Sequence, residues 1–213
     1  GITLSTLHQS GLGALYLMAK DKIHPLWYSE FIPIMFFVSS VFAGLSMVIF
    51  EGSISHKVFS MQINEKNHHK QNEIIRGLAK ICAGTMFAYF FLKLLVFIHE
   101  QGWVLINTPM GYWFLLEMFG FVLLPMGLFF YSYRANNIPL VKIAAIITML
   151  GVILNRLNVT IIGFKWDMAI RYIPSWMELV VTLAVIFTEI WIFRWVINRM
   201  PVLSDSPSWA KNH

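Results

Sequence analysis

The chain has 213 residues, of which 57% are hydrophobic and 13% are charged, and its formal net charge is +5. A soluble domain carries about 25% charged residues, so this composition excludes a soluble enzyme. The only cysteine, Cys82, excludes an internal disulfide and a four-cysteine iron–sulfur cluster within the chain.

Long apolar runs predict an all-α, polytopic transmembrane helix bundle. Runs of about 20 residues can cross a hydrocarbon layer of about 30 Å, and continuous rather than alternating apolar residues favour helices over strands. We expect one partial and five full membrane helices, at residues 1–19, 31–50, 74–98, 112–131, 140–164 and 176–197. Because the chain opens inside the first of these helices, we expect it to be part of a longer protein.

Polar segments separate the predicted helices. Residues 20–30 are expected to form a short solvated connection, and residues 51–73 the longest polar loop. Pro125 with Gly127 should weaken the hydrogen-bond ladder of the fourth helix and permit a kink. The predicted organisation is one helix bundle at residues 1–200 and a polar tail at residues 201–213.

The loop charges predict the orientation of the bundle. One side carries nine Lys and Arg residues and the other carries four, and the richer side is expected to be cytoplasmic. That side includes the C-terminus. Anionic lipid headgroups explain the positive charge, and no charge run is long enough to bind nucleic acid.

Aromatic residues are concentrated at the opposite, outer boundary. Such residues form an interfacial belt, and their density here is also compatible with a surface that docks a partner. The residues concerned are Trp27, Tyr28, Trp103, Tyr112, Trp113, Trp166, Tyr172 and Trp176.

Ionisable side chains at membrane depth are costly and therefore mark candidate sites. At about 1.5 Å of rise per residue, His8 lies near the midplane, and Lys93, Glu117 and Arg156 lie about 9 to 12 Å inside the outer boundary. Glu178 lies close to that boundary, and only Glu189 falls in the inner half. Most of these groups share one leaflet, as a polar pocket that opens outward would require.

Each candidate also has a structural interpretation. His8 lies in a polar stripe that could hold helices together by hydrogen bonds alone. Arg156, with Asn155 and Asn158, could form a buried ion pair with Glu117 or a site for a polar headgroup. Lys93 could reach the outer surface along its aliphatic stem, and Glu178 could be a solvated carboxylate at a helix start.

The histidines argue against haem and metal sites. A membrane-embedded b-type haem commonly takes axial histidines at depth, and only His8 of the seven histidines is predicted to be deep. His68 and His69 have Asn and Lys neighbours and no cysteine nearby, which is typical of a solvated loop. No metal site is therefore predicted.

Four sequence blocks carry a resemblance to a known family. They are LSTLHQSGLG, KIHPLWYS, GVILNRLNVTIIGF and RYIPSWMELVVTL. They resemble the NrfD/PsrC family of integral membrane quinone-reactive subunits, and most of all its HybB-like branch, the Ni/Fe-hydrogenase 2 "cytochrome b" subunit. Members have about eight to ten membrane helices, so the chain resembles the C-terminal part of such a protein.

The resemblance implies a function and a set of site residues. It implies a haem-free subunit of the bacterial inner membrane that exchanges electrons between menaquinone or menaquinol and a periplasmic iron–sulfur protein, beside a hydrogenase, multihaem cytochrome or molybdoenzyme. The matching polar positions in this chain are His8, Glu117, Asn155, Arg156 and Glu178. His8 or Glu117 would transfer the quinone proton. The quinone-binding residues would be His8, Asn155, Arg156 and Glu178.

Two other functions remain open from the sequence. The chain could be a structural membrane anchor for a catalytic partner. The polar cluster would then only hold the helices of the bundle together. It could also be a proton-translocating module, for which Lys93 and Glu189 are the candidate proton carriers.

Overall fold

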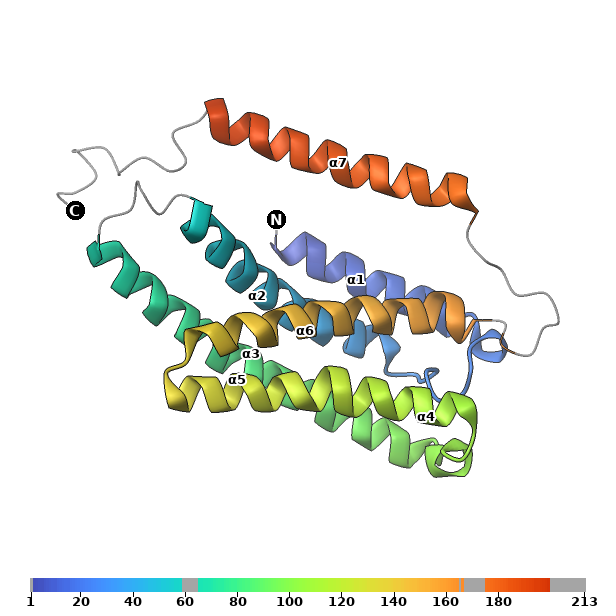
Figure 1. Cartoon of the computed structure of the whole chain (residues 1–213). Helices are drawn as coiled ribbons and strands as arrows, with labels where there is room; N and C mark the ends of the chain where they lie inside the picture. The colour runs from blue at the N-terminus through green and yellow to red at the C-terminus, as the bar shows by residue number, and fades with distance from the viewer. Residues whose placement is uncertain (1, 59–64, 165, 167–174, 200–213) are drawn as a thin grey trace. The chain divides into compact units, whose positions relative to one another are not determined.

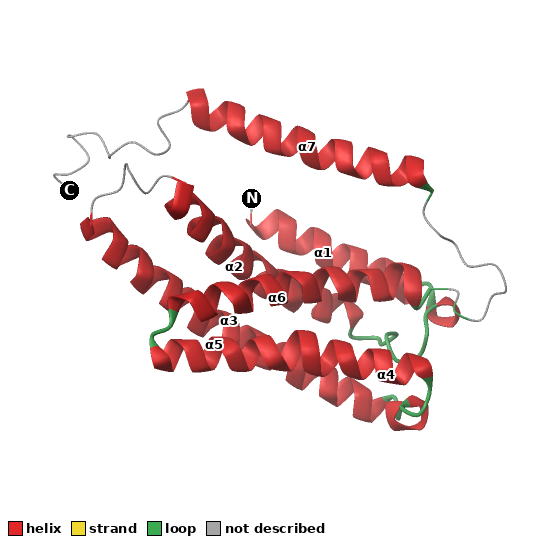
Figure 2. Cartoon of the chain, in the orientation of Figure 1, coloured by secondary structure: helices red, strands yellow, loops and turns green. Residues whose placement is uncertain are grey.

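The computed structural model describes residues 2–58, 65–164, 166 and 175–199. It divides into two compact units, residues 1–169 and 170–213, and each is described by itself. Helices make up the described elements and no strand occurs among them (Figure 2). Five helices are long and apolar enough to cross a membrane, which confirms the predicted all-α polytopic class.

The first unit contains the site. Its α-helices are α1 (Ile2–Leu17), α2 (Ile32–Val58), α3 (Glu65–His99), α4 (Pro109–Leu116), α5 (Leu124–Ala135) and α6 (Ile138–Leu157). Two 3-10 turns, η1 (Lys20–Lys22) and η3 (Gly102–Leu105), lie in its connections. Two π-helical segments, η4 (Glu117–Leu123) and η5 (Asn158–Ile162), continue α4 and α6.

The helices of this unit pack around α2 and α6. Helix α2 contacts α1, α3 and α6, and α5 contacts both α3 and α6 (Figure 1). Helices α5 and α6 are joined by Asn136, in the left-handed conformation at φ 52°, and by Asn137, whose side chain caps α6 by accepting from the N–H of Leu140. This tight turn places α5 and α6 side by side.

Most of the described chain outside these helices gathers at one end of the bundle, which we call the His24 end. It comprises residues 20–31 and 101–108 with Gly163 and Phe164, next to the start of α4 in Figure 1. The predicted solvated connection at residues 20–30 is wrong in part, because Ile23, His24 and Trp27 are buried there. The N–H of His24 donates to the carbonyl of Gly163 at 2.8 Å and ties the two segments together.

The polar loop predicted at residues 51–73 is shorter than expected. Helix α2 continues to Val58 and α3 begins at Glu65. The helices continue past the apolar runs into polar sequence, because Glu, Lys and Gln are good helix formers. The sequence prediction followed hydropathy alone, and it therefore ended the first of these helices too early and began the second too late.

Pro125 distorts the fourth membrane helix in a specific way. Proline has no N–H to donate to the carbonyl four residues earlier, which here belongs to Phe121, and the π-helical segment η4 precedes it. Gly151 of α6 packs on that carbonyl, since a Cβ on Gly151 would meet the Phe121 oxygen at 2.8 Å. The disturbance predicted at Pro125 is therefore a widened turn that α6 covers.

The second unit contains α7 (Trp176–Arg199), with Glu178 in its first turn. Ser175 precedes the helix, and its side-chain oxygen accepts from the N–H of Glu178 at 3.4 Å. The span Trp176–Val196 is long and apolar enough to cross a membrane. The predicted polar tail at residues 201–213 lies outside the described residues.

Candidate functional site

A buried carboxylate, Glu117, is the centre of the site. Its side chain is 1% exposed and forms an ion pair with the Nζ of Lys93. Asn155 donates to Oε1 at 2.7 Å, and Trp27 and Asn158 donate to Oε2 at 2.8 and 2.5 Å. These five residues are called the Glu117 network. A buried charge is costly unless it is paired and hydrogen-bonded, and here both carboxylate oxygens are fully engaged.

The network joins four separate parts of the first unit. Trp27 comes from the His24 end, Lys93 from α3, Glu117 from η4, and the two asparagines from α6 and η5. Glu117 and Asn158 are the first residues of the two π-helical segments. Such segments occur frequently at functional sites, because a widened turn redirects the side chains that follow it.

Arg156 connects this network to the helix surface. Its Nη2 donates to the hydroxyl of Ser39 at 2.8 Å and the carbonyl of Phe36 at 3.3 Å, and its Nη1 donates to the side-chain oxygen of Asn155 at 3.4 Å. The guanidinium also lies 3.6 Å from the centroid of the Phe36 ring. A guanidinium has five N–H donors, so among the described residues two donors of Arg156 lack a protein acceptor.

An open groove of about 650 Å³ runs along α1, α2 and α6 past Arg156. Its end nearer the His24 end carries polar groups from Tyr16, Arg156 and Thr160. Its remainder is mainly apolar, with Gln9 and Ser40 as the polar exceptions. The apolar lining residues are Leu12, Ala43, Gly44, Met47, Met149, Val152 and Ile153.

Two small cavities flank the ion pair of the network. One, of about 10 Å³, is lined by Glu117, Asn155 and Ser39. The other, of about 30 Å³, is lined by Lys93 and Asn155 and extends to Glu100 at the end of α3. A water molecule needs about 10 to 15 Å³ and polar partners, so both cavities have the size and lining for water.

His24 closes the site at its end of the bundle. Its imidazole lies 4.8 Å from the Trp166 ring and 5.5 Å from that of Trp27, centroid to centroid. The Nδ1 atom accepts from the N–H of Leu26 at 3.2 Å. Burial lowers the pKa of His24 below its ordinary value, so the imidazole is neutral at pH 7, as an accepting Nδ1 requires.

The structure brings together four of the seven predicted site residues. Lys93, Glu117, Asn155 and Arg156 form one continuous set of contacts. The ionic partner of Glu117 is Lys93, whereas the sequence had suggested Arg156. The suggestion that Lys93 reaches the outer surface is also wrong, because its side chain is 6% exposed and faces Glu117.

The other three predicted site residues lie outside this set. His8 is exposed on α1, and its neighbour Gln9 rather than His8 lines the groove. Glu178 and Glu189 lie on α7 in the second unit. Their roles in quinone binding and proton transfer stay predictions.

Two tryptophans of the predicted aromatic belt point inward instead. Trp27 donates to Glu117, and the indole of Trp113 donates to the side-chain oxygen of Asn158 at 2.8 Å. Their sequence context is the same as that of belt residues, so hydropathy could not separate them. The one available signal was the indole N–H, which needs an acceptor when it is buried.

Comparison with known proteins gives a family match and two relatives. The family described as "Polysulphide reductase, NrfD" matches residues 2–169. A protein of Nitratidesulfovibrio vulgaris (strain Hildenborough) is 40% identical over all of this chain and 55% of its own length. The "Probable Ni/Fe-hydrogenase 2 b-type cytochrome subunit" of Escherichia coli K12 is 24% identical over 95% of this chain and 51% of its own length. The chain thus spans about half the length of these curated relatives, and no solved structure matches it significantly.

The name of the Escherichia coli relative raises the question of haem in this chain. Axial ligation by two histidines needs two free imidazole nitrogens that face one another at depth. Of the histidines whose side chains are described, His24 uses Nδ1 as an acceptor at the His24 end, and His99 is exposed beside Glu100. Only His8 remains, so the described histidines do not fit a haem.

Proposed function

The chain belongs to the NrfD family, and from that premise we propose that it is part of a membrane subunit of a respiratory oxidoreductase that exchanges electrons between menaquinone or menaquinol and an iron–sulfur protein. The chain is a multi-pass membrane protein, which supports a lipid-soluble redox substrate. The Escherichia coli relative, a probable hydrogenase subunit by name, supports a role beside a redox enzyme. The terminal partner would be a hydrogenase, a multihaem cytochrome or a molybdoenzyme.

The groove past Arg156 is the observation that carries the proposal. A menaquinone has a polar ring with two oxygens and a long apolar tail. The groove offers two uncommitted guanidinium donors near one end and a mainly apolar lining along the rest. Two of the helices that line it, α2 and α6, are long and apolar enough to span a membrane. We therefore place the ring beside Arg156 and the tail along Ala43, Met47 and Met149.

The residues around Arg156 account for the charge changes of the reaction. Oxidation of menaquinol to menaquinone releases two electrons, which pass to the iron–sulfur partner, and two protons. Arg156 would stabilise negative charge on a ring oxygen, as pre-positioned donors do in other sites. One of the two protons would pass to Glu117 through water in the small cavity lined by Ser39, Asn155 and Glu117, and the other would leave through the open groove.

The His24 end is the proposed docking side for the iron–sulfur protein. The excess of Lys and Arg on the opposite side predicts a periplasmic His24 end and a cytoplasmic C-terminus in the bacterial inner membrane. Large aromatic side chains are exposed at this end, including Trp103 and Trp166, and protein interfaces are enriched in such residues. Docking there would bring the cluster to the same end of the bundle as the Arg156 ring site.

An Arg156→Gln substitution in the full-length subunit, within its intact complex, tests the proposal. We expect quinol-linked electron transfer to fall about 100-fold, as on loss of a charge-stabilising donor, while the complex stays assembled. Arg134→Gln is the matched control, because Arg134 is exposed at the other end of the bundle. Unchanged electron transfer in the Arg156 variant would contradict quinone binding here, and loss of assembly would favour a structural anchor.

Proton translocation is a second candidate function, favoured by the two small cavities beside the Lys93–Glu117 pair. Water in them would link Asn155 and Glu117 to Glu100 at the His24 end. Under this hypothesis, Glu117→Gln should reduce proton release measured with a pH electrode more than it reduces electron transfer. Equal loss of both would leave Glu117 as a residue of the quinone reaction only.

A further inference from the structure

A second groove lies between α3 and α5, away from the quinone groove. It has a volume of about 440 Å³, and its lining is almost entirely apolar. Lys80 and Tyr133 line one end, and Phe87 lines the part beyond them. The hollow exists because Gly84 of α3 and Gly127 of α5 have no side chains. A Cβ placed on either glycine would meet no atom within 4 Å, so both positions are open to an occupant.

The dimensions of this groove suit a lipid chain. Seven residues of α3 separate Lys80 from Phe87, which corresponds to about 10 Å along the helix, within the roughly 15 Å hydrocarbon depth of one leaflet. Phe87 and Phe130 line the groove with exposed rings. An acyl chain laid across Gly84 and Gly127 would contact both rings.

Positive charge is concentrated at one end of the groove. The guanidinium of Arg76 and the Nζ of Lys80 lie 5.0 and 5.8 Å from the centroid of the same Tyr133 ring. Arg134 follows Tyr133 and lies over Phe130 at 5.7 Å. The Nε of Arg76 is buried and has no hydrogen-bond acceptor among the described residues, which is unusual for a buried polar atom.

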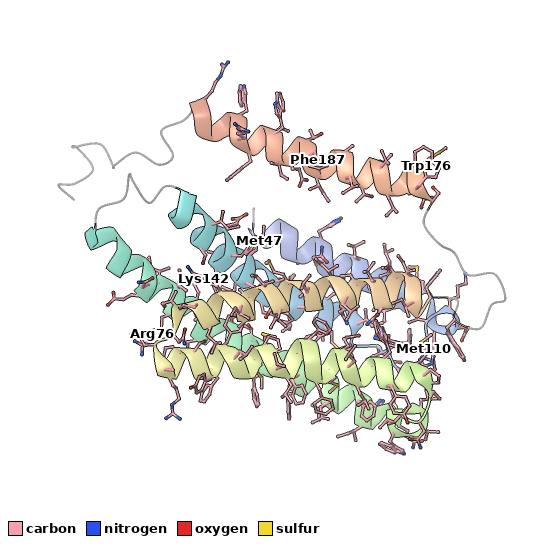
Figure 3. All side chains as sticks on the ribbon, in the orientation of Figure 1. Met47, Arg76, Met110, Lys142, Trp176 and Phe187 are labelled. Atoms are coloured by element: carbon pink, nitrogen blue, oxygen red, sulfur yellow. The ribbon has the colours of Figure 1, made fainter. Side chains whose placement is uncertain are left out.

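We propose that this groove binds an anionic phospholipid, with an acyl chain over Gly84 and Gly127 and the phosphate between Arg76 and Lys80. Arg76 lies at the end of the bundle away from Met110 and the start of α4 (Figure 3), where the loop charges predict the anionic cytoplasmic leaflet. The phosphate would compensate the guanidinium charge of Arg76 and the ammonium charge of Lys80, which face the same Tyr133 ring. This inference does not depend on the proposed quinone function.

Native mass spectrometry of the detergent-purified full-length protein tests the site. The protein is mixed with equal amounts of phosphatidylglycerol and phosphatidylcholine that carry the same acyl chains. Arg76→Gln and Lys80→Gln remove the charges one at a time, and Gly84→Leu fills the groove. Lys142→Gln is the control, because Lys142 lies at the same end of the bundle (Figure 3) but does not line this groove.

We expect the wild type to retain phosphatidylglycerol preferentially. Each charge removed should lower that preference about fivefold, the ratio that corresponds to one basic residue near an anionic lipid. Gly84→Leu should abolish retention of both lipids, and Lys142→Gln should change neither. Equal retention of the two lipids by the wild type would overturn the proposal, as would an unchanged preference after Lys80→Gln, whose exposed side chain is not needed for folding. Failure of the intact complex to retain the lipid that the isolated subunit retains would overturn the proposal for the assembled protein.

Discussion

Glu117 and Lys93 are a buried ion pair whose two members depend on each other. Lys93 also lies 4.9 Å from the Phe114 centroid and 5.8 Å from that of Tyr89, so its surroundings beyond Glu117 are mainly aromatic. Removing one member of a buried pair leaves the other charge uncompensated. Stability at this position therefore depends on the pair and not on either residue alone.

The Glu117→Gln substitution should therefore destabilise the protein strongly. We expect a loss of about 3 kcal/mol in the free energy of unfolding, because the Lys93 ammonium stays buried without a carboxylate. Titration of the full-length protein with SDS, followed by tryptophan fluorescence, measures this change. The double variant Glu117→Gln with Lys93→Met should recover part of the loss. If the double variant lost the sum of both single effects, the two side chains would not be coupled.

His24 should make the stability of the protein depend on pH. Burial lowers its pKa in the folded state, so on acidification the unfolded chain takes up a proton near pH 6.5 before the folded protein does. Unfolding is then favoured progressively as the pH falls below about 6.5, and no such effect exists above it.

The matched variant for this prediction is His24→Asn, which can keep a side-chain acceptor for the N–H of Leu26 but does not titrate. Thermal unfolding in detergent between pH 7.5 and pH 5 should show a steeper loss of stability for the wild type than for this variant. Parallel curves would mean that His24 does not carry the pH dependence.

Helix α1 approaches α2 closely at one glycine. A Cβ on Gly13 would meet the Cα of Pro33 at 2.8 Å and the carbonyl oxygen of Ile32 at 3.1 Å, both of which are backbone atoms. The contact matters for the site because α1 and α2 form two walls of the groove past Arg156. Gly11, two residues earlier and so on roughly the opposite face of the helix, has no atom within 4 Å of such a Cβ.

These two glycines allow a matched comparison within one helix. Gly13→Ala should cost about 1 to 3 kcal/mol, as overpacking does, and should weaken binding of a quinone-analogue inhibitor by shifting α1. Gly11→Ala should be neutral, or stabilising by up to about 1 kcal/mol through its helix propensity. SDS titration and inhibitor binding measure the two effects. Similar behaviour of both variants would show that the α1–α2 contact does not shape the groove.

Helix positions could be predicted from the sequence far better than side-chain partners. The apolar runs located all five spans, because the cost of an unsatisfied backbone in lipid leaves no alternative to helices. The rise per residue along each helix placed Lys93, Glu117 and Arg156 at similar membrane depths, and their side chains do belong to one set of contacts. It could not assign Lys93 as the partner of Glu117, because rise along an axis contains no information on which face of a helix meets which neighbour.

At the scale of the whole molecule, orientation decides which compartment the His24 end faces. The native Cys82 is fully buried, so its thiol should not react with a cysteine-labelling reagent. Asn107 and Ala135 are exposed at opposite ends of the bundle. Both positions lie outside the Glu117 network and the two grooves.

A membrane-impermeant maleimide should label an Asn107→Cys variant in intact spheroplasts, because the His24 end is predicted to be periplasmic. An Ala135→Cys variant should be labelled only after lysis, because its end carries the excess of Lys and Arg. The reverse pattern would invert the orientation and move both the proposed partner and the proposed lipid site to the other compartment.

The most direct measurement of the central claim is cross-linking of a photoreactive azidoquinone to the full-length subunit in its native membrane. Mass spectrometry of the digested protein would identify the labelled segments. Label should appear on α1, α2 and α6 at residues lining the groove, such as Tyr16, Met47 and Ile153, and excess menaquinone should compete it away. Label confined to other segments, or label that excess menaquinone does not reduce, would contradict quinone binding beside Arg156.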